Sequence, residues 1–172
     1  MKPVLLVTGA SRGIGAATAV LAAQQGWRVV VNYSTNRTAA DQVVSQIEQA
    51  GGEAFAVQAD VGDEAQIMAM FQRIDSQWGR LDGLVNNAGV VDMPSRVDEM
   101  TVPRLERMFR LNVIGSFLCA REAVRRYEKL HIERMLRECD DKREAARRMG
   151  IGLSSLYRRM AELGIQLDQD EE

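Results

Sequence analysis

The chain of 172 residues is 46% hydrophobic with a formal net charge of −2, so it can build a core and is not drawn to nucleic acid by its overall charge. Its two cysteines, Cys119 and Cys139, favour a reducing compartment over a disulfide scaffold, and we expect a cytoplasmic protein. No apolar run approaches the roughly 18 residues of a membrane-spanning helix, and we expect neither a membrane partner nor a metal site.

Apolar runs and helical patterns alternate through the first part of the chain. Strands are expected at residues 4–7, 29–31, 54–58 and 81–86. Helices are expected at residues 14–25, 38–50 and 63–78, with Asp63 as the N-cap of the third helix and Gly79 just past its end. This alternation predicts an α/β fold, in which a parallel sheet of about four strands carries helices on both faces.

The segment TGASRGIG, residues 8–15, follows the first expected strand and opens the first expected helix. Its glycines, Gly9, Gly13 and Gly15, would let backbone N–H groups approach a pyrophosphate, to which the helix N-terminus adds its dipole. Their spacing departs from GxGxxG, so a glycine turn without a ligand is the alternative for this turn taken alone.

Three further motifs follow in order: Asp60-Val61 after the third strand, NNAG at residues 86–89, and Asn112 within RLNVIG. Together with TGASRGIG they resemble the motifs of the short-chain dehydrogenase/reductase family. The resemblance covers residues 1–126 and implies a truncated, Rossmann-like, dinucleotide-binding domain, with Asn112 as a vestigial catalytic residue. The expected cofactor-binding residues are Gly9, Ser11, Arg12, Gly13, Ile14, Gly15, Arg37, Asp60, Val61, Asn87, Ala88 and Gly89.

Charge favours NADP(H) over NAD(H) as the cofactor. An acidic residue after the second strand would bind the ribose 2′-hydroxyl and repel a 2′-phosphate, but this chain has Asn32-Tyr33-Ser34 there. Arg12 in the glycine turn and Arg37 after the second strand are expected to clamp a 2′-phosphate. The alternative for Arg37 is an exposed, solvated side chain.

The resembled family reduces carbonyls or oxidises alcohols with a serine and a Tyr-x-x-x-Lys pair, in which the lysine lowers the pKa of the tyrosine. Tyr33, Tyr127 and Tyr157 are followed four residues later by Arg, His and Ala, so the sequence contains no such pair. No fifth strand with a catalytic serine is recognisable after Asn112. We therefore expect an inactive dehydrogenase half, with His131 as a surface or packing residue.

A different pattern occupies residues 127–167. Helices are expected at residues 130–139, 142–149 and 154–163, with an aspartate pair at 140–141 and a glycine turn at 150–152 between them. Between Lys142 and Arg159, six basic residues stand against one acidic residue, whereas the whole chain is slightly acidic. Such a local basic excess on a helix-turn-helix is typical of a phosphate-contacting surface. The expected core consists of Ala146, Met149, Ile151 and Leu156.

Residues 142–159 resemble the Fis-type helix-turn-helix, the C-terminal DNA-binding domain of many bacterial enhancer-binding response regulators. The resemblance implies double-stranded DNA as the partner, with the last helix in the major groove. The expected DNA-binding residues are Lys142, Arg143, Ser154, Ser155, Tyr157, Arg158 and Arg159. A solvated basic helix pair is the alternative. The mostly acidic residues 168–172 are expected to form a frayed tail.

No Gly or Pro occurs between Gly115 and Gly150, so one long helix is expected from residue 103 to residue 139. A helix of this length suits dimer packing, and we expect a homodimer. The helix or a partner subunit would cover Leu84 and Val85, because a sheet that ends at the fourth strand leaves them on an apolar edge.

Three interpretations follow. The leading one is a hybrid of a catalytically incomplete NADP(H)-binding half and a DNA-binding module. Such a hybrid is either a nucleotide-responsive DNA binder or a fusion without evolved coupling, and the linker-free junction slightly favours a fusion. The first alternative is an NADP-dependent short-chain oxidoreductase that obtains its Tyr-Lys pair from elsewhere. The second is a DNA-binding protein whose front half serves only as a dimerisation scaffold.

Overall fold

The computed structural model describes residues 2–165 and divides the chain into two compact units, Met1–Ala123 and Val124–Glu172. The first unit has an α/β fold and the second is built of helices, which confirms the predicted fold class. Among the described residues, none of the helices combines the length and the apolar character that crossing a membrane requires. The acidic tail predicted at residues 168–172 lies outside the described residues.

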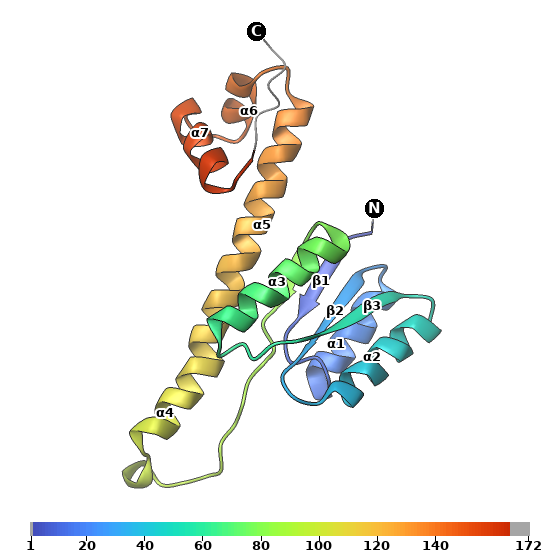
Figure 1. The fold of residues 1–172 in the computed structure, drawn as a ribbon, viewed down its shortest axis with the longest axis vertical. Helices are drawn as coiled ribbons and strands as arrows, with labels where there is room; N and C mark the ends of the chain where they lie inside the picture. Colours follow the sequence, from blue (N-terminus) through green and yellow to red (C-terminus); the bar gives the residue numbers. More distant parts are fainter. Residues whose placement is uncertain (1, 166–172) are drawn as a thin grey trace. The chain divides into compact units, whose positions relative to one another are not determined.

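Four parallel strands form the sheet of the first unit, in the order β3-β2-β1-β4 (Figure 1). They are β1 (Val4–Val7), β2 (Arg28–Tyr33), β3 (Glu53–Gln58) and β4 (Gly83–Val85). The fourth strand is shorter than the predicted range 81–86. At its start the carboxylate of Asp82, instead of a backbone carbonyl, accepts a hydrogen bond from the N–H of Val4 at 2.8 Å. At its end the N–H of Asn87 turns back to the carbonyl of Val85 at 3.0 Å.

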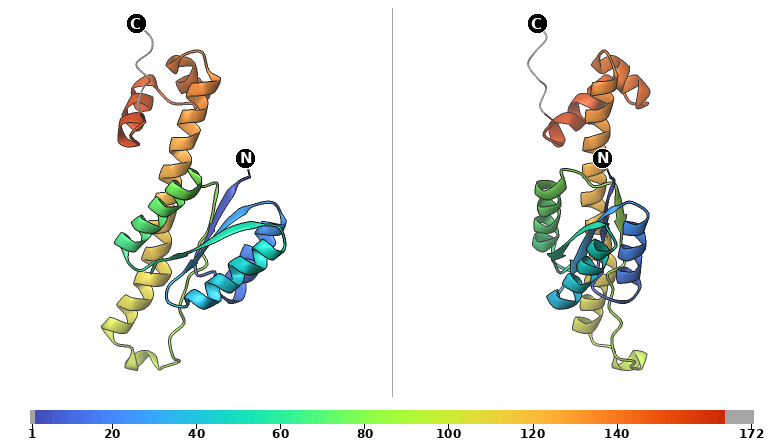
Figure 2. Two further views of the ribbon diagram at one scale, coloured as in Figure 1. Left: turned by 45° about the vertical axis from the view of Figure 1, so that its right-hand side comes forward. Right: turned by 90° about the vertical axis from the view of Figure 1, so that its right-hand side faces the viewer.

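Helices cover both faces of this sheet, as predicted (Figure 1, Figure 2). They are α1 (Gly13–Gln24), α2 (Arg37–Gln49) and α3 (Glu64–Trp78). The core on one face joins β1 and β2 to α1 and α2. The core on the other face joins the sheet to α3 and to Cys119. Asp63 caps α3 by accepting hydrogen bonds from the N–H groups of Ala65 and Gln66, and this confirms the predicted cap.

The predicted edge of the sheet is β4, which pairs only with β1 within residues 2–165. Leu84 and Val85 are half-buried, on opposite faces of the sheet. Leu84 packs against the same core cluster as Cys119, which lies on helix α5 (Gly115–Glu138). The long helix therefore covers one face of the edge strand, while the backbone edge of β4 has no neighbouring strand within the described part of the chain.

The predicted long helix is present, but it is not α-helical throughout. Helix α4 (Val102–Phe109), a π-helical turn (Arg110–Ile114) and α5 follow one another without a break. Two contacts coincide with the wide turn. The side chain of Asn112 bonds to the backbone of Val90, and the absence of a Cβ at Gly115 lets the carbonyl of Val61 approach the helix. The expectation of a regular α-helix here was therefore wrong, because sequence periodicity does not show these long-range contacts.

The second unit packs the C-terminal part of α5 with α6 (Lys142–Arg148) and α7 (Leu153–Glu162). Its core contains Ala146 and Leu156, with Met149 and Ile151 packed against it, as predicted. Asp141 caps α6 by accepting a hydrogen bond from the N–H of Glu144 at 2.7 Å. Helix α7 begins at Leu153, with Gly152 as its N-cap, and not at the serine pair predicted to open it.

Candidate functional site

The glycine turn packs directly against the segment that follows β4. Gly9 and Gly13 have φ angles of 62° and 58°, a region that favours glycine. A Cβ on Gly9 would lie 2.9 Å from the Cα of Ala88, and a Cβ on Gly15 would lie 2.7 Å from the carbonyl oxygen of Gly9. Gly9 and Gly15 therefore allow an approach between backbones that any side chain would prevent.

The N-terminus of α1 is open to a ligand. Its N-cap residue, Arg12, makes no side-chain capping bond, and a Cβ on Gly13 would have nothing within 4 Å. Arg12 and Ile14 are exposed, while Ser11 is half-buried. The first turn of a helix carries backbone N–H groups without partners inside the helix and a positive dipole end. This end of α1 can therefore bind an anion such as a phosphate.

The hydroxyl of Thr8 joins the glycine turn to the segment after β4. Thr8 is 1% exposed, and its Oγ1 accepts hydrogen bonds from the N–H groups of Asn87 and Ala88, both at 3.0 Å. The Asn87 side chain donates to the carbonyls of Thr8 and Gly9 at 2.8 and 3.1 Å. The role of Thr8 was not predicted, although the residue opens the TGASRGIG motif and a buried threonine needs a hydrogen-bond partner.

Asn32 holds the glycine turn from the other side. It is 1% exposed, and its Oδ1 accepts a hydrogen bond from the N–H of Gly9 at 3.0 Å. Its Nδ2 donates to the carbonyls of Val57 and Ala59 at the end of β3, at 3.3 and 3.1 Å. Of the three residues that the sequence placed in the ribose region, Asn32 and Tyr33 are thus buried, and only Ser34 is exposed.

Arg12 and Arg37 lie beyond the carboxyl ends of two neighbouring parallel strands. Val7 pairs with Val31, so the segments after β1 and β2 leave the sheet at the same edge. Both arginines are exposed. The Nε of Arg37 lies 3.4 Å from the carboxylate of Asp41, one helical turn away. Because this ion pair is exposed, it contributes little, and an anionic ligand can replace it.

Asp60 and Val61 follow β3, as expected, and have different surroundings. The Asp60 Oδ1 accepts a hydrogen bond from the N–H of Gly62 at 2.8 Å. Val61 is 5% exposed and belongs to the core. Asp60 lies at an open depression of about 490 Å³ beside the N-terminus of α3, which Arg107 and Arg110 also line. Asp60 is therefore accessible to a ligand, whereas Val61 contributes mainly to packing.

Asn112 contacts the polypeptide backbone of the loop after β4. Its Oδ1 accepts from the N–H of Val90 at 2.8 Å, and its Nδ2 donates to the carbonyl of Val90 at 2.9 Å. Gly89 is exposed and close to Asn112, since a Cβ on it would lie 3.5 Å from the Asn112 Oδ1. The Asn86 side chain donates to the carbonyl of Ser116 at 3.0 Å. The side-chain amides of Asn86 in the loop and Asn112 in the helix thus hold the two segments together.

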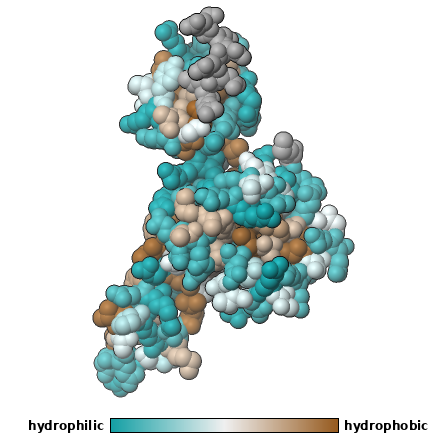
Figure 3. Space-filling view, in the orientation of Figure 1, coloured by the Kyte–Doolittle hydropathy of each residue, from teal (hydrophilic) through white to brown (hydrophobic). Residues whose placement is uncertain are grey.

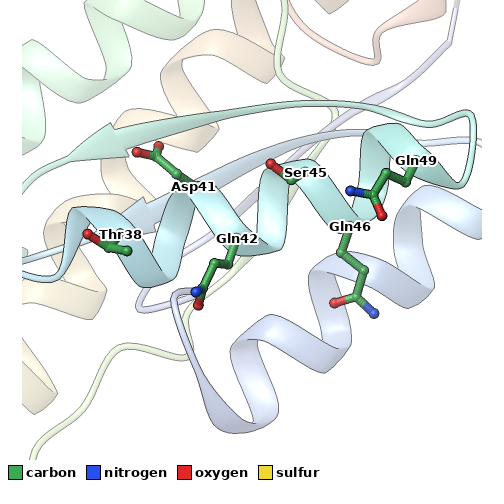
Figure 4. Close-up of a pocket in the computed structure, with 6 residues that line it drawn as sticks. All are labelled: Thr38, Asp41, Gln42, Ser45, Gln46 and Gln49. Carbon is green, nitrogen blue, oxygen red and sulfur yellow. The ribbon is translucent and has the colours of Figure 1, made fainter.

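A second depression, of about 410 Å³, runs along the exposed side of α2 (Figure 4). Its lining consists of Thr38, Asp41, Gln42, Ser45, Gln46 and Gln49. All six side chains belong to one helix, and no other element closes over them, so the depression is a polar helix surface. No cluster of three or more potential metal ligands occurs in the part of the chain that the structure describes.

In the second unit, helix α7 turns part of the predicted DNA-binding set outward. Ser154, Tyr157 and Arg158 are exposed, while Ser155 and Arg159 are half-buried. The opposite side of α7 is buried through Leu156 and Met160. The three exposed residues therefore form the outer face of α7.

Several basic side chains of this unit pair with acidic side chains. Glu144 lies 2.5 Å from Arg147 and 2.9 Å from Arg148, and these two contacts lower the pKa of its carboxyl. Arg158 lies 3.9 Å from Glu162. Lys142 is half-buried and Arg143 is exposed. The predicted basic excess is thus partly neutralised locally.

The three tyrosines lie in different surroundings. Tyr33 is buried in the first unit, and Tyr157 is on the outer face of α7. Tyr127 stacks on His131 within α5, with the ring centroids 6.0 Å apart. His131 is half-buried in this stack, which agrees with the predicted surface or packing role.

Comparison with known proteins finds a match for each part of the chain. Residues 3–131 match the family described as short chain dehydrogenase, and residues 123–163 match the family described as bacterial regulatory protein, Fis family. The uncharacterized oxidoreductase YgfF of Escherichia coli is 52% identical over 123 residues, which cover 72% of this chain and 50% of that protein. A versicolorin reductase of Emericella nidulans is 45% identical over 122 residues, which cover 71% of this chain and 46% of that protein.

Solved structures of short-chain dehydrogenases also match the first part of the chain. A short-chain dehydrogenase/reductase from Serratia marcescens is 37% identical with a TM-score of 0.69, and the match covers 72% of this chain and 50% of that one. The chain spans about half the length of the relatives it matches. Both resemblances drawn from the sequence motifs are confirmed. The chain belongs to the short chain dehydrogenase family through residues 3–131, and the overlapping residues 123–163 are similar to the Fis family.

Proposed function

We propose that the protein is a hybrid, whose first unit binds NADP(H) without dehydrogenase activity and whose second unit binds double-stranded DNA. The observation that carries the first part is the open N-terminus of α1, where no side chain caps the helix and the space beside Gly13 is free. A dinucleotide pyrophosphate fits this end through the helix dipole and the free N–H groups. The functional division between residues 126 and 127 remains a prediction.

The remaining cofactor contacts would come from the loops at the same edge of the sheet. Asp60 lies in an open position after β3 and can accept hydrogen bonds from an adenine. The backbone of Asn87, Ala88 and Gly89 would face the middle of the dinucleotide, since this segment packs on Gly9 and Gly15. Family membership supports these assignments. A bound nicotinamide would supply or accept a hydride.

The choice of NADP(H) over NAD(H) rests on Arg12 and Arg37. Both are exposed at one sheet edge, and Ser34, the exposed residue directly after β2, is not acidic. Calorimetric titration with NADP⁺ and NAD⁺ tests this choice. Arg37→Gln should weaken NADP⁺ binding by about 10- to 100-fold, the loss of one charge-assisted hydrogen bond, and leave NAD⁺ binding unchanged.

The matched control is Arg73→Gln, which removes an exposed arginine from α3. It should bind both dinucleotides as the unmodified chain does. An equal loss of NADP⁺ and NAD⁺ affinity in Arg37→Gln would contradict a clamp on the 2′-phosphate. No binding of either dinucleotide would contradict the cofactor proposal itself and favour the interpretation of the first unit as a dimerisation scaffold.

The tyrosines and Asn112 support the proposed catalytic incompleteness. No tyrosine of the chain is followed by a lysine at the fourth position, and Tyr33, the tyrosine nearest the glycine turn in the sequence, is buried in the core. Asn112 uses both ends of its amide on the backbone of Val90. We expect no turnover in an NADPH-oxidation assay with a panel of carbonyl compounds. Turnover that disappears in Asn112→Ala would instead support the alternative of an active oxidoreductase.

DNA binding rests on the outer face of α7 and on the similarity to the Fis family. Ser154, Tyr157 and Arg158 are exposed there and would enter the major groove. Lys142 and Arg143, at the start of α6, would contact phosphates, and Ser155 and Arg159 are the half-buried members of the predicted set. Fluorescence anisotropy with a labelled DNA duplex of mixed sequence tests this binding. Salt-insensitive or absent binding would contradict it, because phosphate contacts make affinity fall with salt.

An exposed apolar face supports the proposed homodimer. Leu105, Phe109, Val113 and Phe117 follow at spacings of four residues along α4, the π-helical turn and α5, and thus lie on one helix face. Phe109 is 60% exposed and Phe117 is 74% exposed. Apolar side chains are visible at the surface around α4 in Figure 3. At about 150–250 Å² per aromatic side chain, the two phenylalanines alone leave roughly 200–300 Å² of apolar surface in water. Leu105 and Val113 add to this area, and a contiguous apolar patch of a few hundred Å² is often functional.

Sedimentation equilibrium tests the dimer. The chain should sediment as a dimer at micromolar concentration, and Phe109→Glu together with Phe117→Glu should shift it to a monomer. Leu21→Glu is the matched control, since Leu21 is a 58% exposed apolar residue on α1, outside the proposed interface. A monomeric unmodified chain, or an unchanged dimer in the double variant, would contradict the proposal.

Coupling between the two units distinguishes a nucleotide-responsive DNA binder from a fusion without evolved coupling. DNA affinity should be measured with and without saturating NADPH. A change in affinity requires that NADPH bind the DNA-bound and free forms differently, and by linkage DNA would then change NADPH affinity by the same factor. Equal affinities in the two measurements would rule out the responsive form and leave the uncoupled fusion.

A further inference from the structure

Arg159 differs from the other basic residues of α7 because it forms an ion pair with another helix. Its guanidinium pairs with the carboxylate of Glu128 on α5. The Arg159 side chain is 40% exposed and the Glu128 side chain is 27% exposed. In contrast, the partner of Arg158 is Glu162, which lies in α7 itself, and that pair is largely exposed. The Arg159–Glu128 pair therefore links α7 to α5.

The position of Arg159 on α7 agrees with such a link. Leu156 and Met160 form the buried side of the helix. Ser155 and Arg159 are four residues apart, so they share one side of the helix, and both are half-buried. This flank lies between the buried side and the outer face formed by Ser154, Tyr157 and Arg158.

We propose that Arg159 is a positioning residue, which together with Glu128 fixes the rotation of α7 on α5 and does not itself contact a DNA phosphate. The pair would keep the outer face of α7 turned toward the groove. To reach a phosphate, Arg159 would have to leave a half-buried carboxylate without its partner, which is unfavourable. This inference rests on the proposed DNA binding and removes Arg159 from the expected set of DNA contacts.

The salt dependence of DNA binding separates the two roles. The full chain is titrated against a fluorescein-labelled duplex of mixed sequence at a series of salt concentrations. Each phosphate contact contributes about 0.9 to the slope of log affinity against log salt concentration. Arg143→Gln, which removes an exposed arginine proposed to contact a phosphate, should lower the slope by about this amount. Arg159→Gln should keep the slope of the unmodified chain and lower the affinity by up to about fivefold at every salt concentration.

Three further variants keep the test independent of folding defects. In Glu128→Arg/Arg159→Glu the pair is reversed at constant net charge, and we expect the affinity to return to within about twofold of the unmodified chain. Glu128→Gln should weaken binding as Arg159→Gln does, and the double variant Glu128→Gln/Arg159→Gln should be no weaker than either single variant. Thermal unfolding followed by circular dichroism identifies variants that are folded at the temperature of the titration.

Three outcomes would overturn the inference. The first is a slope that falls as much in Arg159→Gln as in Arg143→Gln. The second is weaker binding by the reversed pair than by Arg159→Gln alone, because a glutamate at a phosphate contact repels DNA. The third is tighter binding by Glu128→Gln than by the unmodified chain. If the unmodified chain does not bind the duplex, the proposed DNA-binding function fails; if it binds and any of these three results appears, only the role of Arg159 fails.

Discussion

Replacing Thr8 by valine should loosen the junction between the glycine turn and the segment after β4. Valine has nearly the shape of threonine and suits the buried position, where Thr8 is 1% exposed. It removes one hydroxyl, which accepts hydrogen bonds from the N–H groups of Asn87 and Ala88 and donates to the carbonyl of Val85 at 3.3 Å. The effect of the substitution therefore depends on which of these backbone groups keeps another partner.

The structure indicates that one group loses its partner. The N–H of Asn87 also bonds to the carbonyl of Val85 at 3.0 Å, and that carbonyl also accepts from the N–H of Thr8 at 3.0 Å. The N–H of Ala88 has Thr8 as its acceptor. One unpaired, partly buried N–H destabilises a protein by about 1–3 kcal/mol. For a unit of this size, the thermal midpoint should fall by roughly 3–6 °C per kcal/mol.

Circular dichroism measures the midpoint, and amide hydrogen exchange measures the local effect. In Thr8→Val the amide of Ala88 should exchange faster, while amides in the centre of β1 change only with global stability. Thr8→Ser is the matched control: it loses one buried methyl group, at a cost of about 1 kcal/mol, but keeps the hydroxyl and hence the protection of Ala88. Unchanged exchange at Ala88 in Thr8→Val, or faster exchange in Thr8→Ser as well, would refute this reasoning.

Three further outcomes are expected. Gly15→Ala should destabilise the first unit by about 1–3 kcal/mol in urea unfolding and abolish dinucleotide binding, because its Cβ would lie 2.7 Å from a backbone carbonyl oxygen; an unchanged midpoint would contradict the packing of the turn. In the native protein a thiol reagent should modify Cys139 and spare Cys119, because burial and a nearby carboxylate raise the pKa of Cys119 to about 11; mass spectrometry of the labelled peptides would reveal the opposite order. Burial alone would raise the pKa of Asp82, but hydrogen bonds from a guanidinium and a backbone N–H lower it overall. The ionised carboxylate therefore stabilises the fold at neutral pH, and this contribution is lost as the pH falls below about 4. The difference in thermal midpoint between Asp82→Asn and the unmodified chain should shrink between about pH 7 and pH 3, and a constant difference would contradict this assignment.

Local sequence signals predicted the elements well where a single interaction decides the outcome. The cap of α3 at Asp63 depends on one side chain and the two N–H groups next to it. The close approach at Gly9 and Gly15 requires the absence of a Cβ, so glycine in the motif already indicates it. For α7, by contrast, the serine pair suggested the start, but the helix begins at Leu153, directly after Gly152 in the N-cap position.

The chemistry of the candidate site was predicted less completely. Asn32 was considered only as a non-acidic residue in the ribose region, yet it is buried and bonds to the glycine turn and to the end of β3. Asn112 was assigned from a motif, and its contact with Val90 spans 22 positions in the sequence. Such partners are distant along the chain, and no periodic pattern within one segment reveals them.

The sequence by itself determined the alternation of strands and helices, the glycine turn, the local basic excess and the absence of a Tyr-x-x-x-Lys pair. These features depend on residue type and short-range spacing. Only the tertiary structure decided that Asn112 lies in a π-helical turn, that Thr8 joins two loops, and that Arg159 is paired with Glu128 while Arg158 lies on the outer face. These features depend on which groups meet when the chain is packed, because a side chain is committed to a partner only once burial has removed water as the alternative.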